Sequence, residues 1–331
     1  MNQPEISVIL PVYNAAAYLE ESIQSILHQS FPNFELIIIN DGSTDGSQAI
    51  IEKFKDPRII HVVQANIGLA ATLNRGIGMA RAEIIARQDN DDVSYPNRFE
   101  KQLNYLKSHP DTVLLGTAAR IIDQEGNAVD RFHLHPTNND TLKFLLLFDN
   151  PFVHSSVMFR KSAVTAVGGY DTNERYFEDY RLWSQLSRKG KIANLQEVLV
   201  DYREVNTGMS KSASNYQLKV IHQSVENIAY LLTHYGVDDL KRFVGQSRGE
   251  GPFSELKKDF AAFEKFLSDL SLAFEKQYQP ARDGLMAAKD KIRKQFLRAY
   301  YNTVIQSPGA GPLTKILARI KRRIIIMQMK S

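Results

Sequence analysis

The chain has 331 residues, of which 43% are hydrophobic and 24% charged; these are ordinary globular values that exclude wholesale disorder and a fibrous fold. It has no cysteine, which excludes disulfides, thiolate catalysis and cysteine metal sites. Residues 1–210 carry 20 Lys and Arg against 26 Asp and Glu, whereas residues 211–331 carry 21 against 11. The length suits one large domain with a smaller addition, and the two parts differ in electrostatic character.

The N-terminal part alternates between apolar runs and helical patterns. Runs that are apolar on both faces predict buried strands at residues 6–12, 34–41, 58–66 and 83–89. Helical spacing predicts helices within residues 15–31 and 67–80, and the loop DGSTDGS offers capping residues for another helix. Such alternation predicts an α/β fold with a parallel sheet covered on both sides.

Polar residues follow these predicted strands. Asn14, Asp41, Asn66 and Asp89 each come just past an apolar run. In an open α/β sheet, ligands bind beyond the carboxyl ends of the strands. We therefore expect the functional residues to gather there.

The chain then continues with less regular elements. We expect a helix over residues 97–108, a hairpin over 112–130, a strand over 155–160, a short helix near 164–171, a helix over 176–190 and a strand over 191–203. From Lys211 the pattern changes to long helices separated by polar and glycine-rich breaks. We therefore predict two domains, 1–210 and 211–331, with the boundary near Ser210.

Three carboxylates, Asp89, Asp91 and Asp92, stand within four positions directly behind the fourth strand. In an extended segment Asp89 and Asp91 point the same way and Asp92 points elsewhere. Two acids aimed at one point are compatible if a hard divalent cation, Mg²⁺ or Mn²⁺, lies between them. Capping of the next helix is the alternative, and Asp92 would suit that role; the pattern alone leaves both interpretations open.

Taken together, several segments resemble the inverting family-2 glycosyltransferases. They are ISVILPVYNAAAYLEESIQSILHQSFPNFELIIINDGSTDGS, ANIGLAATLNRGIGMARAEIIARQDNDDVSYPNRFEKQ, HSSVMFRKSAVTAVGGYD and YFEDYRLWSQLSRKG. The resemblance extends from Ile6 to Ser210 and does not cover the helices beyond. It implies the GT-A fold, a nucleotide-diphosphate sugar donor and a divalent metal, Mn²⁺ or Mg²⁺.

The resemblance also implies roles for single residues. Pro11 and Tyr13 would line the nucleotide base. Asp41, which in isolation reads as part of a capping loop, would accept the N3–H of uracil. Asp89 would lie near the ribose and the metal, and Asp91 would ligate the metal.

Catalysis is assigned in the same way. Asp179 matches the general base, with Glu178 beside it, and transfer would be a single displacement that inverts the anomeric centre. Without the family pattern, both acids would be read as favourable charges in the first turn of a helix.

Other candidates are weaker. His154 would touch the acceptor or the diphosphate, or would be structural, and we expect Trp183 to pack in the core. Many relatives carry a histidine where this chain has Val205, so Arg203 or Asn206 would have to substitute for its contact.

The C-terminal segment 314–331 predicts an amphipathic helix. Ile316, Leu317, Ile320, Ile324 and Met327 share one side, and Lys315, Arg319, Arg322 and Arg323 lie opposite. Such a helix suits an anionic membrane surface, or docks on its own protein or on a second copy in a homo-oligomer. No nucleic-acid-binding motif accompanies the charge, so we expect no nucleic-acid partner.

The expected function is transfer of a sugar, hexosyl or N-acetylhexosaminyl, from a UDP-linked donor to a glycan or lipid-linked glycan in surface or capsular polysaccharide assembly. A sugar nucleotidyltransferase is disfavoured because no glycine-rich basic loop follows the first strand. A catalytically silent nucleotide-sugar-binding or scaffolding module is the alternative. We expect no signal peptide and no membrane span, and hence a cytoplasmic location, with or without peripheral attachment to the inner face of the cell membrane.

Overall fold

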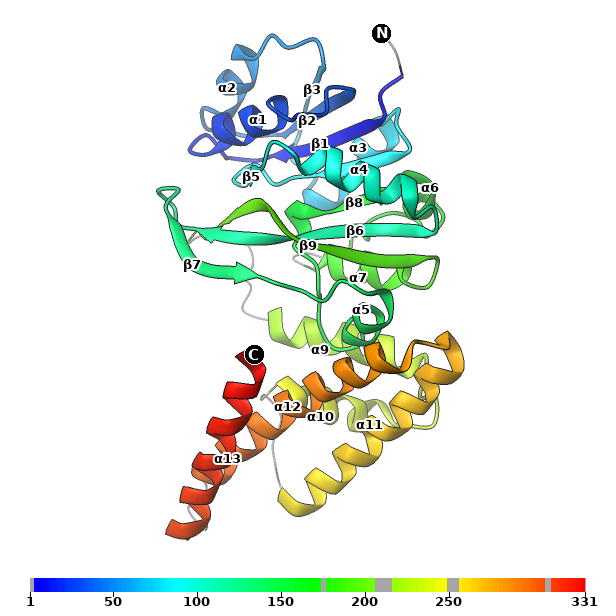
Figure 1. Ribbon diagram of the computed structural model, residues 1–331. Coiled ribbons are helices and arrows are strands. Elements are labelled where there is room, and N and C mark those ends of the chain that lie inside the picture. Colours follow the sequence, from blue (N-terminus) through cyan, green and yellow to red (C-terminus); the bar gives the residue numbers. More distant parts are fainter. Residues whose placement is uncertain (1–2, 174–176, 206–215, 249–255, 307–310, 331) are drawn as a thin grey trace. The chain divides into compact units, whose positions relative to one another are not determined.

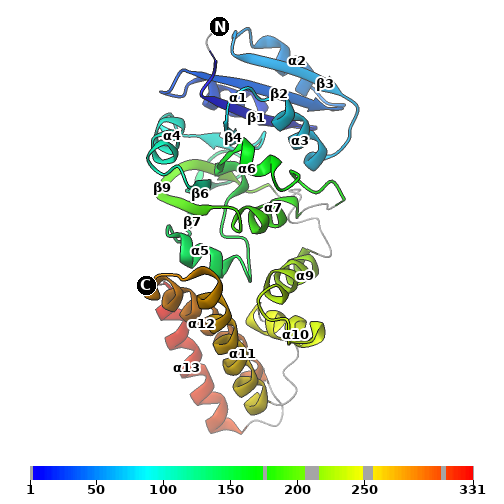
Figure 2. The same ribbon diagram turned by 90° about the vertical axis from the view of Figure 1, so that its right-hand side faces the viewer.

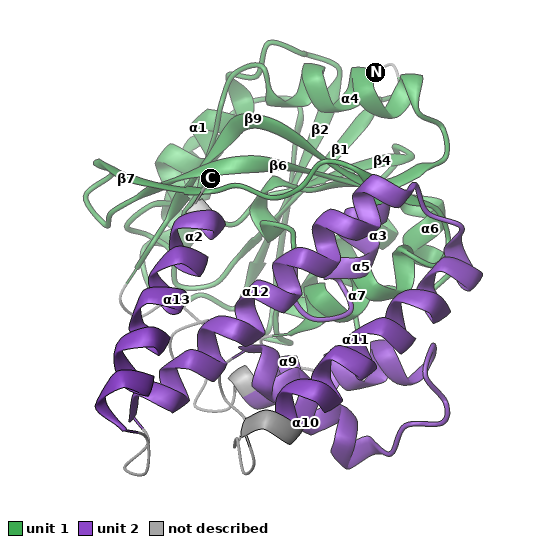
Figure 3. Ribbon diagram, turned by 60° about the horizontal axis from the view of Figure 1, so that its bottom comes forward, with its two compact units in different colours: residues 1–139, 151–216 green, residues 140–150, 217–331 purple. Residues whose placement is uncertain are grey.

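Figures 1 and 2 show a computed structural model of the protein, which describes residues 3–173, 177–205, 216–248, 256–306 and 311–330. The chain divides into two compact units (Figure 3), one of residues 1–139 and 151–216 and the other of residues 140–150 and 217–331. Residues 140–150 thus belong to the second unit, so the two units cannot be separated by cutting the chain at a single position. The boundary predicted near Ser210 lies outside the described residues, as does Asn206.

One sheet runs through the first unit. Among the described residues it has nine strands in the order β3-β2-β1-β4-β8-β6-β9-β5, with β7 paired to β6. The strands are β1 (Ile6–Val12), β2 (Phe34–Asp41), β3 (Ile59–Gln64), β4 (Ile84–Arg87), β5 (Val93–Ser94), β6 (Thr112–Ile122), β7 (Ala128–His133), β8 (Met158–Arg160) and β9 (Lys191–Arg203).

The pairing changes direction along this sheet. β3, β2, β1 and β4 are parallel, as the alternation of strands and helices predicted. β8 then runs antiparallel to both β4 and β6, and β9 pairs parallel with β6 and antiparallel with β5. The sheet is therefore mixed. The strand predicted over residues 155–160 is wrong at its start, because His154–Ser156 forms the short 3₁₀ helix η1.

Helices cover both faces of the parallel strands. Alternate side chains of β1, from Ile6 to Val12, belong to a core that also contains Phe99, Leu103 and Leu106 of α4. On the other face α3 approaches so closely that a Cβ on Gly76 would lie 2.6 Å from Cγ2 of Ile9. A larger residue at Gly76 would force Ile9 or the helix to shift, so glycine permits the close packing of α3 at this position.

The helices of the first unit are mostly those predicted from periodicity. They are α1 (Leu19–Leu27), α2 (Ser47–Lys53), α3 (Leu69–Met79), α4 (Arg98–Ser108), α6 (Lys161–Thr165) and α7 (Glu178–Leu186). An additional helix, α5 (Asn139–Leu145), was not predicted and leads into the segment that joins the second unit.

The second unit is helical. Its elements are α9 (Tyr216–Ala229), α10 (Val237–Arg248), α11 (Leu256–Tyr278), α12 (Arg282–Gln306) and α13 (Pro312–Lys330). Its core is rich in aromatic rings, and Phe263 and Phe296 stack with their ring centroids 3.8 Å apart. Phe144 and Phe148, from the inserted segment, belong to the same core. Burial of these rings explains why the segment folds with the later helices.

The tail helix α13 packs along α12 (Figures 1 and 3). Its buried apolar side chains are Ala318 and Ile325. The side predicted to be apolar stays exposed, since Ile316, Leu317 and Ile320 are 49%, 50% and 52% exposed. Among the described residues, no helix has both the length and the apolar content of a membrane span.

Candidate active site

The turn that follows β4 is held from three sides. The amide of Asp89 donates to Ser155 Oγ at 2.9 Å, and Ser22 Oγ donates to the Asp89 carbonyl at 3.0 Å. The side chain of Asn90 donates to the carbonyl of Pro11 at 3.0 Å. Elements far apart in the sequence therefore fix the backbone that presents the three aspartates.

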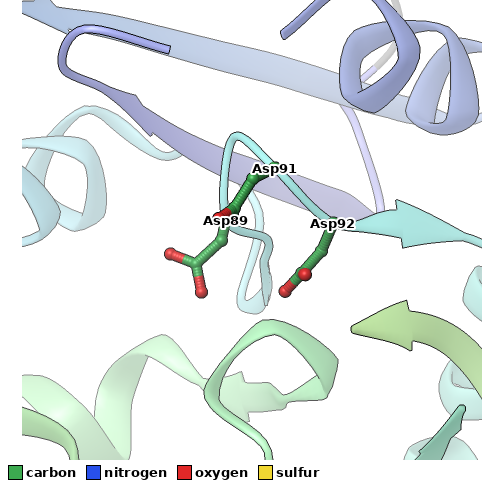
Figure 4. Close-up of side chains that lie close together, drawn as sticks. All are labelled: Asp89, Asp91 and Asp92. Atoms are coloured by element: carbon green, nitrogen blue, oxygen red, sulfur yellow. The ribbon is translucent and has the colours of Figure 1, made fainter. Parts of the chain in front are cut away.

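This turn brings all three carboxylates together. Asp89, Asp91 and Asp92 can each offer one oxygen, and these oxygens lie within 4.8 Å of one another (Figure 4). Asp92 does not cap the next helix, because α4 starts at Arg98, its N-cap residue is Asn97, and the amide of Phe99 in its first turn donates to Gln29 Oε1 at 3.0 Å. The segment turns at Asn90 and Asp91 instead of staying extended, so the rule of alternating directions does not hold there.

Burial makes this cluster electrostatically unfavourable without a cation. Burial raises the pKa of Asp91 to about 7, and the neighbouring Asp89 charge adds to the rise. Burial also raises the pKa of Asp92 well above its ordinary value, with Asp91 and Asp89 contributing. Oδ2 of Asp92 is buried without a hydrogen-bond partner among the described residues. A hard divalent cation suits such a set of oxygens.

Two arginines support the cluster from the protein side. The buried side chain of Arg87 forms a bidentate ion pair with Asp89. Arg203 is also buried, and its amide donates to Asp92 Oδ1 at 2.7 Å while its Nε donates to the Asp91 carbonyl at 2.9 Å. Its remaining nitrogens donate to the carbonyls of Asp123 and Gln124 and to Glu21. Arg203 thus holds the turn in place.

A pocket of about 300 Å³ opens beside Asp91. Its lining residues are Asn14, Ala15, Tyr18, Asn90, Asp91, Gln124 and Val205. Val205 therefore lies at the pocket, where it adds an apolar wall in place of a polar ligand. Tyr18 and Gln124 were not predicted to lie at the site, because both are uncharged and neither directly follows one of the four predicted parallel strands.

The residues expected at the nucleotide base lie at the ends of β1 and β2. Tyr13 follows β1 and is 51% exposed. Asp41, the last residue of β2, is buried and accepts hydrogen bonds from the Gln64 side chain at 2.8 Å and from the amides of Ile67 and Gly68 at 2.9 and 3.0 Å. Asp41 thus organises the loop after β3. A carboxylate has about four acceptor positions, so a further donor can be accommodated.

The acids of α7 stand in its first turn. Glu178 is buried and accepts the amide of Phe177 at 2.8 Å, and Asp179 Oδ1 accepts the amide of Tyr180 at 2.7 Å. Tyr170 is buried near these acids. Burial raises the pKa of Tyr170, the charge of Arg87 opposes the rise, and the charges of Asp179, Glu178 and Asp89 add to it.

His154 is part of a buried aromatic group. Its Nε2 lies 3.0 Å from the hydroxyl of Tyr170, and its ring packs edge-on against Trp183 with the centroids 5.7 Å apart. Burial and the charge of Arg87 lower the pKa of His154 well below its ordinary value, so the ring is neutral. Trp183 is fully buried, which confirms the prediction that it packs in the core.

Comparison with known proteins identifies the family. The model of a family described as glycosyl transferase family 2 matches residues 7–168. An uncharacterised glycosyltransferase of Haemophilus influenzae is 33% identical over 251 residues, which are 72% of this chain and 77% of the relative. The amylovoran biosynthesis glycosyltransferase AmsE of Erwinia amylovora is 34% identical over 203 residues, which are 60% of this chain and 75% of the relative.

A solved structure shows the same architecture. The crystal structure of S. aureus TarS 1–349 in complex with UDP-GlcNAc matches with a TM-score of 0.59 at 17% identity, and the match covers 91% of this chain and 92% of that chain. The predicted GT-A fold is thereby confirmed. The family model and the sequence relatives show that this chain is a member of glycosyltransferase family 2.

Proposed function

We propose that this glycosyltransferase moves a sugar from a UDP-linked donor to a glycan or lipid-linked glycan during polysaccharide assembly, with inversion at the anomeric carbon. The observation that carries the proposal is the aspartate cluster at the end of β4. Asp91, one member of this cluster, also lines the pocket. The complex of TarS with UDP-GlcNAc supports a UDP donor. The amylovoran relative supports a role in polymer assembly.

In this proposal the cluster receives the diphosphate end of the donor. Asp91 and Asp89 would hold Mg²⁺ or Mn²⁺, and such a cation supplies Lewis-acid stabilisation of the charge that grows on the leaving diphosphate. Arg87 keeps Asp89 oriented through its ion pair, and Arg203 keeps the turn rigid. Asp41 and Tyr13 would bind the base at the ends of the two neighbouring strands.

The acceptor reacts on the opposite face of the sugar. Its hydroxyl oxygen bonds to the anomeric carbon while the bond from that carbon to the diphosphate oxygen breaks. Asp179 would take the hydroxyl proton on its carboxylate as the new bond forms. A first-turn position on α7 suits this task, because the helix N-terminus stabilises the ionised form that must accept the proton.

Nucleotide and metal binding tests the proposal before any acceptor is known. We expect UDP and Mn²⁺ together to raise the unfolding temperature of the wild-type protein more than either alone, because a ligand that binds only the folded state stabilises it. Asp91→Ala should lose this joint effect. Asp130→Ala, which removes an exposed acid from β7, should keep it and serves as the matched control.

Two results would count against the proposal. If no nucleoside diphosphate stabilises the protein with either metal, or if Asp91→Ala responds like the wild type, the assigned donor site is wrong. A UDP-sugar that binds with metal but yields no UDP with any acceptor would support the silent binding module instead.

A further inference from the structure

The tail helix α13 carries a continuous exposed apolar face, here called the tail stripe: Leu313, Ile316, Leu317, Ile320, Ile324 and Met327. Their exposed fractions run from 44% at Ile324 to 70% at Leu313. The spacing of three and four residues keeps all six on one side of the helix. Exposed apolar residues in such a contiguous row indicate a binding surface.

The tail stripe is not the side on which α13 is anchored. The helix packs along α12, and its buried apolar side chains, Ala318 and Ile325, project from a different side. Lys321 Nζ lies 5.9 Å from the ring centroid of Tyr301 in α12. The second unit therefore fixes the helix and leaves the stripe turned outward.

The charge beside the tail stripe has one sign. Arg319, Lys321 and Arg323 flank it, Lys315 and Arg322 lie on the opposite side of the helix, and residues 312–331 contain no Asp or Glu. Arg319, Lys321 and Arg323 are exposed. An apolar row bordered by cations matches a surface that offers hydrocarbon below a layer of negative charge.

We propose that α13 lies on an anionic lipid surface, with the tail stripe in the acyl boundary and its arginines and lysines at the phosphate layer. A second copy of α13 fits less well, because it offers cations to cations. Residues 211–331 as a whole carry 21 Lys and Arg against 11 Asp and Glu, so a twin subunit gives no net counter-charge. The inference concerns attachment and does not depend on the proposed transfer reaction.

Flotation of the full chain with lipid vesicles tests the proposal. The wild-type protein should float with vesicles of phosphatidylcholine plus phosphatidylglycerol and not with phosphatidylcholine alone, and high salt should weaken the binding. Arg319→Gln/Arg323→Gln should bind about 25-fold more weakly, at about fivefold for each charge. Ile320→Gln/Ile324→Gln should bind about 20-fold more weakly, because two apolar side chains no longer enter the lipid.

A matched control separates this surface from general stickiness. Leu272→Gln/Lys276→Gln removes one exposed apolar residue, 62% exposed, and one exposed cation from α11. It should float like the wild type. Thermal unfolding of each variant checks that it remains folded, and UDP binding with Mn²⁺, measured without lipid, should not change.

Three outcomes would overturn the inference. The first is a wild-type protein that stays with the unbound fraction. The second is that the α13 variants float as well as the control does. The third is that Ile320→Gln/Ile324→Gln converts a dimer into a monomer in sedimentation while flotation is unchanged, which would assign the tail stripe to self-association.

Discussion

The two units bury different chemistry. Around the turn after β4, the first unit buries Arg87, Arg98 and Asp92 together with Gln88 and Gln102. The second unit is built on phenylalanines and leucines, and part of its excess of cations lies on exposed residues of α13, namely Arg319, Lys321 and Arg323. Buried charges cost stability unless every partner is in place, whereas buried rings stabilise by area and contact.

This difference in buried side chains reflects how each unit is stabilised. In the first unit a fully buried guanidinium, Arg98, joins the side chains of Gln88, Ser94 and Gln102 to the carbonyls of Arg87 and Val157. Burial of this charge costs free energy unless all of its hydrogen-bond partners are in place, and the network that they form is then rigid. In the second unit, apolar packing supplies the stability, and most of the charged residues lie on the surface.

The largest expected effect is on turnover. Asp179→Asn should lower kcat by about 10²–10⁴-fold, because the amide cannot take the acceptor proton, while UDP binding with Mn²⁺ is retained. Release of UDP from the donor in the presence of acceptor measures it. Glu178→Gln is the control, since glutamine still accepts the Phe177 amide; equal losses in both variants would remove the assigned role of Asp179.

The next effect concerns the apolar core of the second unit. Phe266 is fully buried, so Phe266→Ala should lower the free energy of unfolding by about 3–5 kcal/mol. Urea unfolding measures this. Leu272→Ala, at an exposed position of the same helix, should change it by only about 0.5 kcal/mol or less. Similar losses at both positions would mean that α11 does not pack as described.

The corresponding prediction for the first unit concerns the buried polar network of Arg98. Arg98→Met should cost about 2–4 kcal/mol, because it leaves buried carbonyl and amide oxygens without donors. Unlike Phe266→Ala, it should also weaken the stabilisation by UDP and Mn²⁺, since the network adjoins the turn that carries Asp91. Arg98→Lys keeps the charge and some donors and should fall between. Nucleotide binding that survives Arg98→Met unchanged would separate the network from the site.

The smallest effect is a dependence of stability on pH. The pKa of Asp91 is raised to about 7 in the fold, so the unfolded chain loses this proton at lower pH than the folded chain does. Stability without metal therefore falls as pH rises from the unfolded pKa toward about 7. Asp91→Asn removes this fall.

Urea unfolding without metal at two pH values measures the difference. The stability of Asp91→Asn relative to the wild type should rise by about 2–3 kcal/mol between about pH 5 and pH 8. Added Mn²⁺ should reverse the ranking at the higher pH, because only the wild type offers the carboxylate. A relative stability that does not vary with pH would contradict the burial of charge at Asp91.

The sequence by itself determined the elements that depend on local pattern. Apolar runs and helical spacing specified β1 to β4, their parallel pairing and the helices between them, because the pattern of apolar residues along a segment shows whether one or both of its faces are buried. The same logic located the carboxylates at the end of β4 and the helix of the tail. The family pattern added the GT-A fold.

Only the tertiary structure decided how distant segments meet. Three features join residues that are far apart in the chain. β8 pairs antiparallel with β4, residues 140–150 pack in the aromatic core formed by later helices, and Arg203 donates a hydrogen bond to the aspartate turn. Asp92 faces its neighbours because the backbone turns where an extended segment was assumed. Likewise, the periodicity of α13 fixed its apolar side, but packing along α12 decided that this side would remain exposed.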